Sequence, residues 1–291
     1  MPSETWLAAS GLTISEWHCP GAVRALGPEE APAAYELSVV REGAYLRHLR
    51  DRTVAADPST LLCGTPAEPF RLAQRVGAAA RETVVALDEP SFRALLGETD
   101  PRAGDAAAAT FPADAITLTG RGALVHAALL RVHREGSDPV ALQELAMELA
   151  RWAVRPDTRP RRPARALSRH AMEAVHHTRA TLAMRFAERL TLDDLGRAVS
   201  FTSWHLSRVF RAATGESVHQ HLLRIRLHAA LERVALGGRN LSRIALECGF
   251  SSHSHFTSAF RRAYGSSPSR AFHRGPPASM ADRPLRIGAA R

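Results

Sequence analysis

The sequence contains no lysine, so all 38 basic side chains are arginines, whose planar guanidinium groups stay charged and bind phosphates and carboxylates bidentately. Cysteine is also scarce. Cys19, Cys63 and Cys248 lack the paired spacing of a disulfide framework or a structural zinc site. We expect three buried thiols, with a redox or metal role for Cys19 beside His18 as the less favoured alternative.

Long hydrophobic runs are missing as well. The chain opens with MPSETWLAASGLTISEWHCPG, which has neither the basic start nor the apolar core of a signal peptide. No later run approaches the roughly 20 apolar residues that span a bilayer. We therefore expect a cytoplasmic protein without membrane contact. Its 291 residues are enough for two domains, each with its own core.

Charge is distributed unevenly along the chain. Residues 1–150 hold 13 Arg against 20 Asp plus Glu, whereas residues 151–291 hold 25 Arg against 9 acidic residues. The first part is therefore mildly acidic and the second strongly basic. A basic half of this kind indicates contact with nucleic acid, although a membrane-surface patch would produce a similar balance.

A proline- and arginine-rich stretch, RPDTRPRRPARAL, predicts an exposed linker over residues 155–167. Before it, apolar positions at helical spacing predict a helical hairpin over residues 121–154, broken near Gly136. The hairpin could belong to a core or form a dimer interface. Residues 12–95 differ, because short Val- and Leu-bearing runs between Gly and Pro predict an all-β sandwich or barrel.

An internal repeat marks the second half of the chain. LTLDDLGRAVSFTSWHLSRVFRAATGESV, residues 190–218, aligns with NLSRIALECGFSSHSHFTSAFRRAYGSSP, residues 240–268. The offset is 49 residues up to Ser254 and 50 beyond it, which places one inserted residue after Ser254. Matching apolar positions predict a short helix, a tight turn and a second helix in each copy. The repeat therefore predicts two helix–turn–helix units.

Each predicted unit has a buried and an outward side. A phenylalanine, Phe201 or Phe250, would fill the turn, and a serine, Ser203 or Ser252, would cap the second helix. The outward side of each second helix carries Trp, His, Ser and Arg residues. Two such units in tandem on a basic half favour nucleic-acid binding over a merely solvated surface.

These residues also carry a resemblance to a known family. The pieces LSRVFRAATGESV, RIRLHAALERV and IALECGFSSHSHFTSAFRRAYGSSPS resemble the DNA-binding domain of the AraC/XylS family of bacterial transcription regulators. The resemblance implies two helix–turn–helix subdomains joined by a central helix at about residues 218–236. Each recognition helix would enter a major groove, with the two grooves about one DNA turn, roughly 34 Å, apart.

The resemblance assigns roles along both recognition helices. Arg208 is our choice for base readout, because an arginine pairs bidentately with guanine. The other positions that match base-reading residues of the family are Trp204, His205, Arg211, His253, Ser254, His255 and Ser258. Phosphate contacts are expected from Arg211, Arg224, Arg226, Arg261 and Arg262, and the predicted DNA contacts also include Ser203, Ser207 and Ser252.

The N-terminal segment VVREGAYLRHLRDRTVAADPSTLLCGTPAEPFRL resembles the cupin-like sensor domain that many members of that family carry. The two resemblances together imply the α+β class and four parts of the chain. These are a cupin-like β-barrel with a helical hairpin (residues 1–154), the linker (155–167), an all-α domain of two helix–turn–helix subdomains (168–275) and a flexible tail (276–291).

Patterns of catalysis and metal binding are missing. His253 and His255 stand two positions apart on a predicted helix, about 200° around its axis, so they cannot share an ion. Residues 12–95 contain only His18 and His48, too few for the histidine cluster that holds the metal in cupin enzymes. There is also no phosphate-binding loop, dinucleotide fingerprint or G-x-S-x-G motif. We expect no enzyme, no metal and no cofactor.

The sequence therefore predicts a sequence-specific transcription regulator that binds promoter or operator DNA. The further predicted partners are a small-molecule effector, RNA polymerase and a second copy bound through residues 121–154. Trp17, His18, Tyr35 and Phe70 are the candidate effector contacts. The alternatives are a ligand-independent DNA-binding protein and, less favoured, an enzyme that acts on DNA.

Overall fold

Alternating side chains build the N-terminal part of the chain into strands. In β3 (Tyr35–Glu42), Tyr35, Leu37 and Val39 are buried in one hydrophobic core, while Glu36 and Ser38 line a cavity on the opposite face. The computed structural model describes residues 3–19, 26–74, 79–99, 101–104, 108–155 and 167–273.

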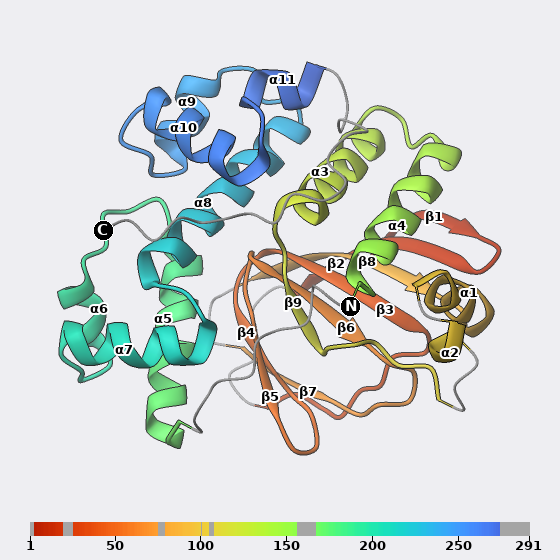
Figure 1. The fold of residues 1–291 in the computed structure, drawn as a ribbon, viewed down its shortest axis with the longest axis horizontal. Helices are drawn as coiled ribbons and strands as arrows, with labels where there is room; N and C mark the ends of the chain where they lie inside the picture. Colours follow the sequence, from red (N-terminus) through yellow and green to blue (C-terminus); the bar gives the residue numbers. More distant parts are fainter. Residues whose placement is uncertain are drawn as a thin grey trace.

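The strands form two antiparallel sheets. The other strands are β1 Ser3–Ala9, β2 Leu12–Cys19, β4 Tyr45–His48, β5 Thr53–Ala56, β6 Thr60–Gly64, β7 Arg71–Gln74, β8 Ala80–Leu87 and β9 Ala115–Thr117. The larger sheet has the order β1-β2-β8-β3-β6-β9 and the smaller one the order β5-β4-β7 (Figure 1). The predicted β-rich N-terminal part is confirmed. Within the described residues, however, its strands lie in two sheets and do not close into one barrel.

Helices follow the sheets and occupy most of the remaining chain. Their bounds are α1 Glu89–Thr99, α2 Pro101–Gly104, α3 Gly120–Arg134, α4 Pro139–Ala153, α5 Arg169–Met184, α6 Leu192–Ala198, α7 Ser203–Thr214, α8 Val218–Ala235, α9 Leu241–Glu247, α10 His253–Tyr264 and α11 Pro268–His273. Among the described residues, no helix combines the length and the apolar character that crossing a bilayer requires.

The predicted helical hairpin is present as α3 and α4. Asp138 begins α4 by accepting hydrogen bonds from the backbone N–H groups of Val140 and Ala141, and Pro139 occupies the first helical position. Gly136 lies between the helices with a positive φ of 121°. In contrast, the β-strand pattern expected up to residue 95 ends at Leu87, because the following residues form α1.

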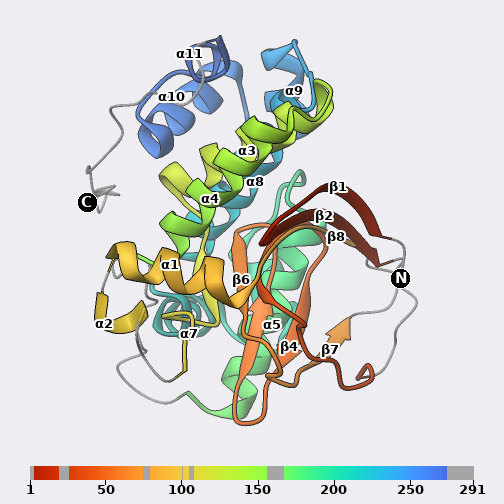
Figure 2. The ribbon, with the colours of Figure 1, turned by 90° about the vertical axis from the view of Figure 1, so that its right-hand side faces the viewer.

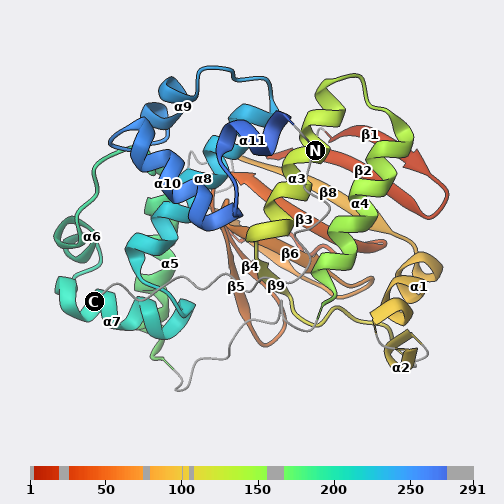
Figure 3. The same ribbon diagram turned by 45° about the horizontal axis from the view of Figure 1, so that its top comes forward.

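One hydrophobic core crosses from the N-terminal sheet into the C-terminal helices. It contains Leu37 and Val85 of the larger sheet, Leu124 of α3, and Leu231 of α8. Figures 2 and 3 show α3 lying beside α8. The first helix–turn–helix unit has a separate core with α5, which includes Leu182, Phe210 and the N-terminal part of α8. The α8 helix therefore belongs to both cores and connects the two units.

The structure corrects two details of the internal repeat. The cap of α7 is Thr202, whose hydroxyl accepts from the backbone N–H of His205, whereas Ser203 is the first helical residue. Ser252 caps α10 as predicted. Because the phenylalanines of the two turns are 49 residues apart and the caps are 50 apart, the inserted residue is Ser251, before α10 rather than after Ser254.

Several predictions concern segments outside the described residues. Most of the linker over 155–167 and the whole tail over 276–291 fall there. The boundaries of the four parts of the chain therefore remain predictions.

Candidate DNA-binding surface and its links to the N-terminal domain

The first recognition helix, α7, turns one face inward and the other toward solvent. Leu206, Val209 and Phe210 are buried, as expected for residues one helical turn apart. On the outer face the indole of Trp204 is 70% exposed, and the guanidinium carbon of Arg208 lies 5.2 Å from the centre of that ring. This cation–π contact holds an exposed arginine beside a flat aromatic surface.

The second recognition helix, α10, repeats this division. Phe256 and Phe260 are completely buried. Its predicted contact residues are exposed, namely Ser252, His253, Ser254, His255, Ser258, Arg261 and Arg262. The N-terminal domain packs on the inner side of α10 and leaves this face open.

The two histidines near the helix starts occupy equivalent places. The ring of His205 packs edge-on against Phe201 at 4.4 Å, and the ring of His255 packs against Phe250 at 5.5 Å. Each histidine therefore rests on the phenylalanine that fills its turn. His255 is exposed and also contacts the hydroxyl of Ser251 through Nδ1 at 3.0 Å. The structural counterpart of Trp204 is accordingly Ser254.

Four arginines of this surface are available for an external partner. Arg208, Arg211, Arg261 and Arg262 are exposed and make no ion pair with any described residue. Other exposed arginines of the same domain are engaged locally, as Arg243 is with Glu247. Guanidinium groups without internal partners are the ones that can pair with phosphates or guanine edges.

Two of the arginines predicted to contact phosphates, Arg224 and Arg226, have internal partners in this structure. Arg224 is largely buried and pairs with Glu216, and burial lowers the pKa of its guanidinium to about 10. Arg226 donates from Nε to the carbonyl oxygen of Phe186 at 2.7 Å and from Nη2 to that of Glu188 at 2.8 Å. Both guanidinium groups therefore connect α8 to neighbouring residues, Arg224 from a largely buried position and Arg226 from a partly exposed one.

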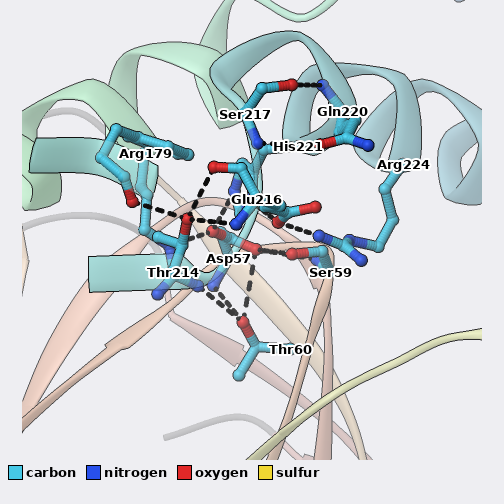
Figure 4. A network of polar contacts seen from close by, with 11 residues as sticks. Asp57, Ser59, Thr60, Arg179, Thr214, Glu216, Ser217, Gln220, His221 and Arg224 are labelled. Atoms are coloured by element: carbon cyan, nitrogen blue, oxygen red, sulfur yellow. Dashed lines mark hydrogen bonds and ion pairs between the residues drawn. The ribbon is translucent and has the colours of Figure 1, made fainter. Parts of the chain in front are cut away.

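A buried carboxylate connects the N-terminal sheets to α5 and α8 (Figure 4). Asp57 lies between β5 and β6 with no exposed surface. It accepts hydrogen bonds from Nε of Arg179 at 2.7 Å and from Nε2 of His221 at 2.9 Å. Burial alone would raise the pKa of Asp57, but the charge of Arg179 and the contact with His221 hold that pKa well below its usual value.

A second group of polar contacts joins the same two parts of the chain. Glu232 of α8 accepts from Nη2 of Arg41 at 2.6 Å and from Arg81 at 3.3 Å. His228, one turn away, contacts the carbonyl oxygen of Pro58 through Nδ1 at 2.6 Å. The sequence pattern does not reveal these partners, because they come from segments far apart along the chain.

The candidate effector contacts separate into two pairs. Trp17 and Phe70 line a cavity between the two sheets. Tyr35 does not, because its ring stacks on Phe92 at 4.0 Å in the hydrophobic core and its hydroxyl donates to the carbonyl oxygen of Ala109. His18 is exposed and does not line the cavity either. Of the four candidate effector contacts, Trp17 and Phe70 line this cavity and Tyr35 and His18 lie outside it.

Comparisons with known proteins agree with this geometry. Residues 195–274 match a family model described as a helix-turn-helix domain. The chain is 36% identical over 83 residues to the probable transcriptional regulator LumQ of Photobacterium leiognathi, which covers 28% of this chain and 34% of LumQ. It is 35% identical over 81 residues to the HTH-type transcriptional activator AarP of Providencia stuartii, covering 28% of this chain and 60% of AarP. The matches thus span less than two thirds of these relatives.

A solved structure is similar over a longer span. ToxT from Vibrio cholerae shares 13% identity with this chain and a TM-score of 0.36, over 89% of this chain and 97% of ToxT.

The C-terminal helices thus define a DNA-binding domain of two helix–turn–helix units joined by α8. The matched residues are those that carry the resemblance to the AraC/XylS family.

Proposed function

We propose that this protein is a sequence-specific DNA-binding transcription regulator that acts in the cytoplasm and has no catalytic role. The observation that carries the proposal is the pair of helices α7 and α10. Both have a buried apolar side, an exposed polar side and arginines that make no ion pair with a described residue, and α8 connects them. Two such helices can enter successive major grooves on one side of the DNA.

The contacts divide into two kinds. Arg208 lies mid-helix on the exposed face of α7, held beside Trp204, where a guanidinium can reach the N7 and O6 acceptors of a guanine. Arg211, Arg261 and Arg262 lie in the last turns of their helices, and we assign them to phosphates, which position the protein without reading sequence. The serines and histidines at the starts of both helices offer hydrogen bonds to base edges or phosphates.

The test is footprinting of the full chain on genomic fragments near its gene at physiological salt, followed by affinity measurements on the protected site. Arg208→Ala should weaken binding by about 1–3 kcal/mol and lose preference at one base position. Arg262→Ala should weaken binding to all sequences alike and reduce the salt dependence. Arg71→Ala, an exposed arginine on β7, is the control and should leave binding unchanged.

Two outcomes would count against the proposal. Unchanged binding by both Arg208→Ala and Arg262→Ala would show that α7 and α10 are not the recognition helices. Absence of any protected fragment would remove the DNA-binding function itself.

Regulation would act through the contact between the two domains. A ligand in the N-terminal domain would favour one packing of that domain on α5 and α8, and so one arrangement of the two DNA-binding units. The buried contacts of Asp57 and Glu232 support this part of the proposal, because they tie the sheets directly to the helices that carry the recognition units.

Dimer formation and contact with RNA polymerase complete the proposal. Residues 121–154 are our proposed dimer surface. Within that hairpin α3 is buried from Gly122 to Leu130 and packs beside α8, so the outer side of α4, with Val140 65% exposed, would supply the contact.

A further inference from the structure

A cavity of about 290 Å³ lies between the two sheets of the N-terminal domain. This volume is near the lower end of the range, about 300–1,000 Å³, that small-molecule sites occupy. Trp17 and Phe70 form part of its wall, and Glu30, Glu36, Glu82 and Arg47 line it as well. Three carboxylates thus face one guanidinium group.

The most deeply placed of these carboxylates has no ion-pair partner within 4.0 Å among the described residues, although the charge of Arg47 acts on it from farther away. Glu82 lies within β8, is only 5% exposed, and makes no ion pair with any described residue. The hydroxyl of Tyr45 donates to it at 2.5 Å. Burial raises the pKa of Glu82 to about 7. A carboxylate buried in this way is costly unless a cation or further donors complete its surroundings.

The guanidinium group of Arg47 in the cavity wall already contacts a backbone carbonyl and an aromatic ring. Arg47 donates from Nη1 to the carbonyl oxygen of Cys63 at 3.2 Å, and its guanidinium carbon lies 4.2 Å from the centre of the Phe70 ring. It makes no ion pair with Glu36 or Glu82 within 4.0 Å. Its Nε is buried and has no hydrogen-bond partner among the described residues, and the residue as a whole is 6% exposed. The described part of the wall therefore carries more acidic than basic side chains and holds an unsatisfied donor.

We propose that this cavity binds a small primary amine that also carries a hydrogen-bond acceptor. The ammonium group would lie between Glu82 and Glu36, and the acceptor would meet Nε of Arg47. The Trp17 ring adds an aromatic wall suited to a cation. This inference rests on the effector part of the proposed function and names the chemical class of that effector.

The test is a thermal-shift screen of the full chain with a library of small primary amines, each matched with the alcohol and the carboxylic acid of the same carbon skeleton. Tyramine, tyrosol and 4-hydroxyphenylacetate form one such set. We expect the stabilising compounds to be amines. No stabilising amine at millimolar concentration, or equal binding of the matched acids, would overturn the proposal.

Variants locate the site by calorimetric titration with the best amine. Glu82→Gln keeps the shape of the side chain and should weaken amine binding at least tenfold. Glu36→Gln should also weaken amine binding. Two cavity variants are used because one of them alone could fail to fold. Glu4→Gln, at an exposed position of β1, is the control and should bind as the native chain does. Unchanged affinity in both cavity variants would place the amine elsewhere and refute the assignment.

The pH dependence of binding gives an independent readout. An ammonium group beside Glu82 favours its charged form, so affinity should rise severalfold between pH 6 and pH 8 in the native chain. Tyr45, Arg47 and Glu36 are the other titratable groups around this carboxylate. A pH-independent affinity would contradict the predicted contact.

Repeating the DNA footprint with the amine separates the two proposals. If the amine binds but leaves the DNA footprint unchanged, the proposed ligand class is supported and the proposal that the ligand controls DNA binding is refuted. If DNA is bound but no amine is, the DNA-binding function stands and the present inference fails.

Discussion

At the scale of single residues, His228 makes the stability of the protein depend on pH. Its imidazole is buried on α8 between the two domains, with Arg224, Asp57 and His221 as charged or titratable neighbours. Burial lowers the pKa of His228 to about 4, although its hydrogen bond with the carbonyl of Pro58 opposes that shift. The folded chain therefore keeps this ring neutral at pH values where the unfolded chain protonates it.

The sign of the effect follows from linkage. The stabilisation is fully present above the unfolded pKa of about 6.5 and is lost as the pH falls toward the folded value. Between pH 7 and pH 5 we expect His228 to reduce the free energy of unfolding by about 2 kcal/mol. Denaturant unfolding of the native chain and of His228→Gln checks this, because the variant should lose that part of the pH dependence. Equal slopes for the two chains would show that His228 is not responsible.

The arginines of the C-terminal helices show which side-chain environments helical periodicity predicts and which it does not. The exposure of Arg208, Arg261 and Arg262 was predictable, because helical periodicity fixes which side of a short helix faces its core. Arg224 and Arg226 were expected to contact phosphates, but helical periodicity did not place their side chains. Their internal partners, Glu216 and two backbone carbonyls, depend on how separate helices pack.

At the scale of elements, Gly196 determines how closely α6 approaches the turn before α7. The carbonyl oxygen of Gly196 accepts from the backbone N–H of Phe201 at 2.9 Å, and a Cβ at position 196 would lie 2.6 Å from the carbonyl oxygen of Phe201. The equivalent place in the second unit is Ala245, whose carbonyl accepts from Phe250. The turn of the first unit therefore has no room for a Cβ at position 196, whereas the turn of the second unit accommodates the Cβ of Ala245.

We predict that Gly196→Ala destabilises the first unit by about 1–3 kcal/mol, because backbone atoms must move to relieve the contact. The matched change, Ala245→Gly, should cost only about 1 kcal/mol through lost helix propensity. Thermal unfolding followed by circular dichroism compares the two. A Gly196→Ala chain as stable as the native one would mean that the turn relaxes freely.

The helices of both units were largely predictable as elements. Their apolar spacing, their hydroxyl caps and the glycines that end α7 and α10 in the left-handed conformation are local signals. The exact cap and the inserted residue were not, because Thr202 and Ser203 are both good capping residues and only the backbone geometry distinguishes them. Helix α1 was missed because it follows β8 after a single residue.

At the scale of the whole molecule, Asp57 holds the two domains together. We predict that Asp57→Asn lowers the free energy of unfolding by about 3–5 kcal/mol, since it leaves the partly buried charge of Arg179 without its counterion. We expect the native chain to unfold in one calorimetric transition, and the variant to show a broader transition or two transitions as the domains unfold separately.

The control for this change is Asp51→Asn, whose side chain is 76% exposed and, among the described residues, forms an ion pair only with its neighbour Arg52. Exposed pairs of this kind contribute little, about 0–1 kcal/mol, so its calorimetric trace should match that of the native chain. A native-like trace for Asp57→Asn would show that apolar packing alone joins the domains.

The sequence by itself determined the repeat, the two recognition helices, their exposed faces and the segregation of basic charge, because each depends on residues within one or two helical turns. Only the tertiary structure decided which arginines are free, which aromatic residues line the cavity and what joins the domains. Asp57 and His221 are 164 residues apart along the chain, and no local periodicity encodes a contact at that separation. Such contacts form only when the sheets and helices pack together and bury their polar groups against one another.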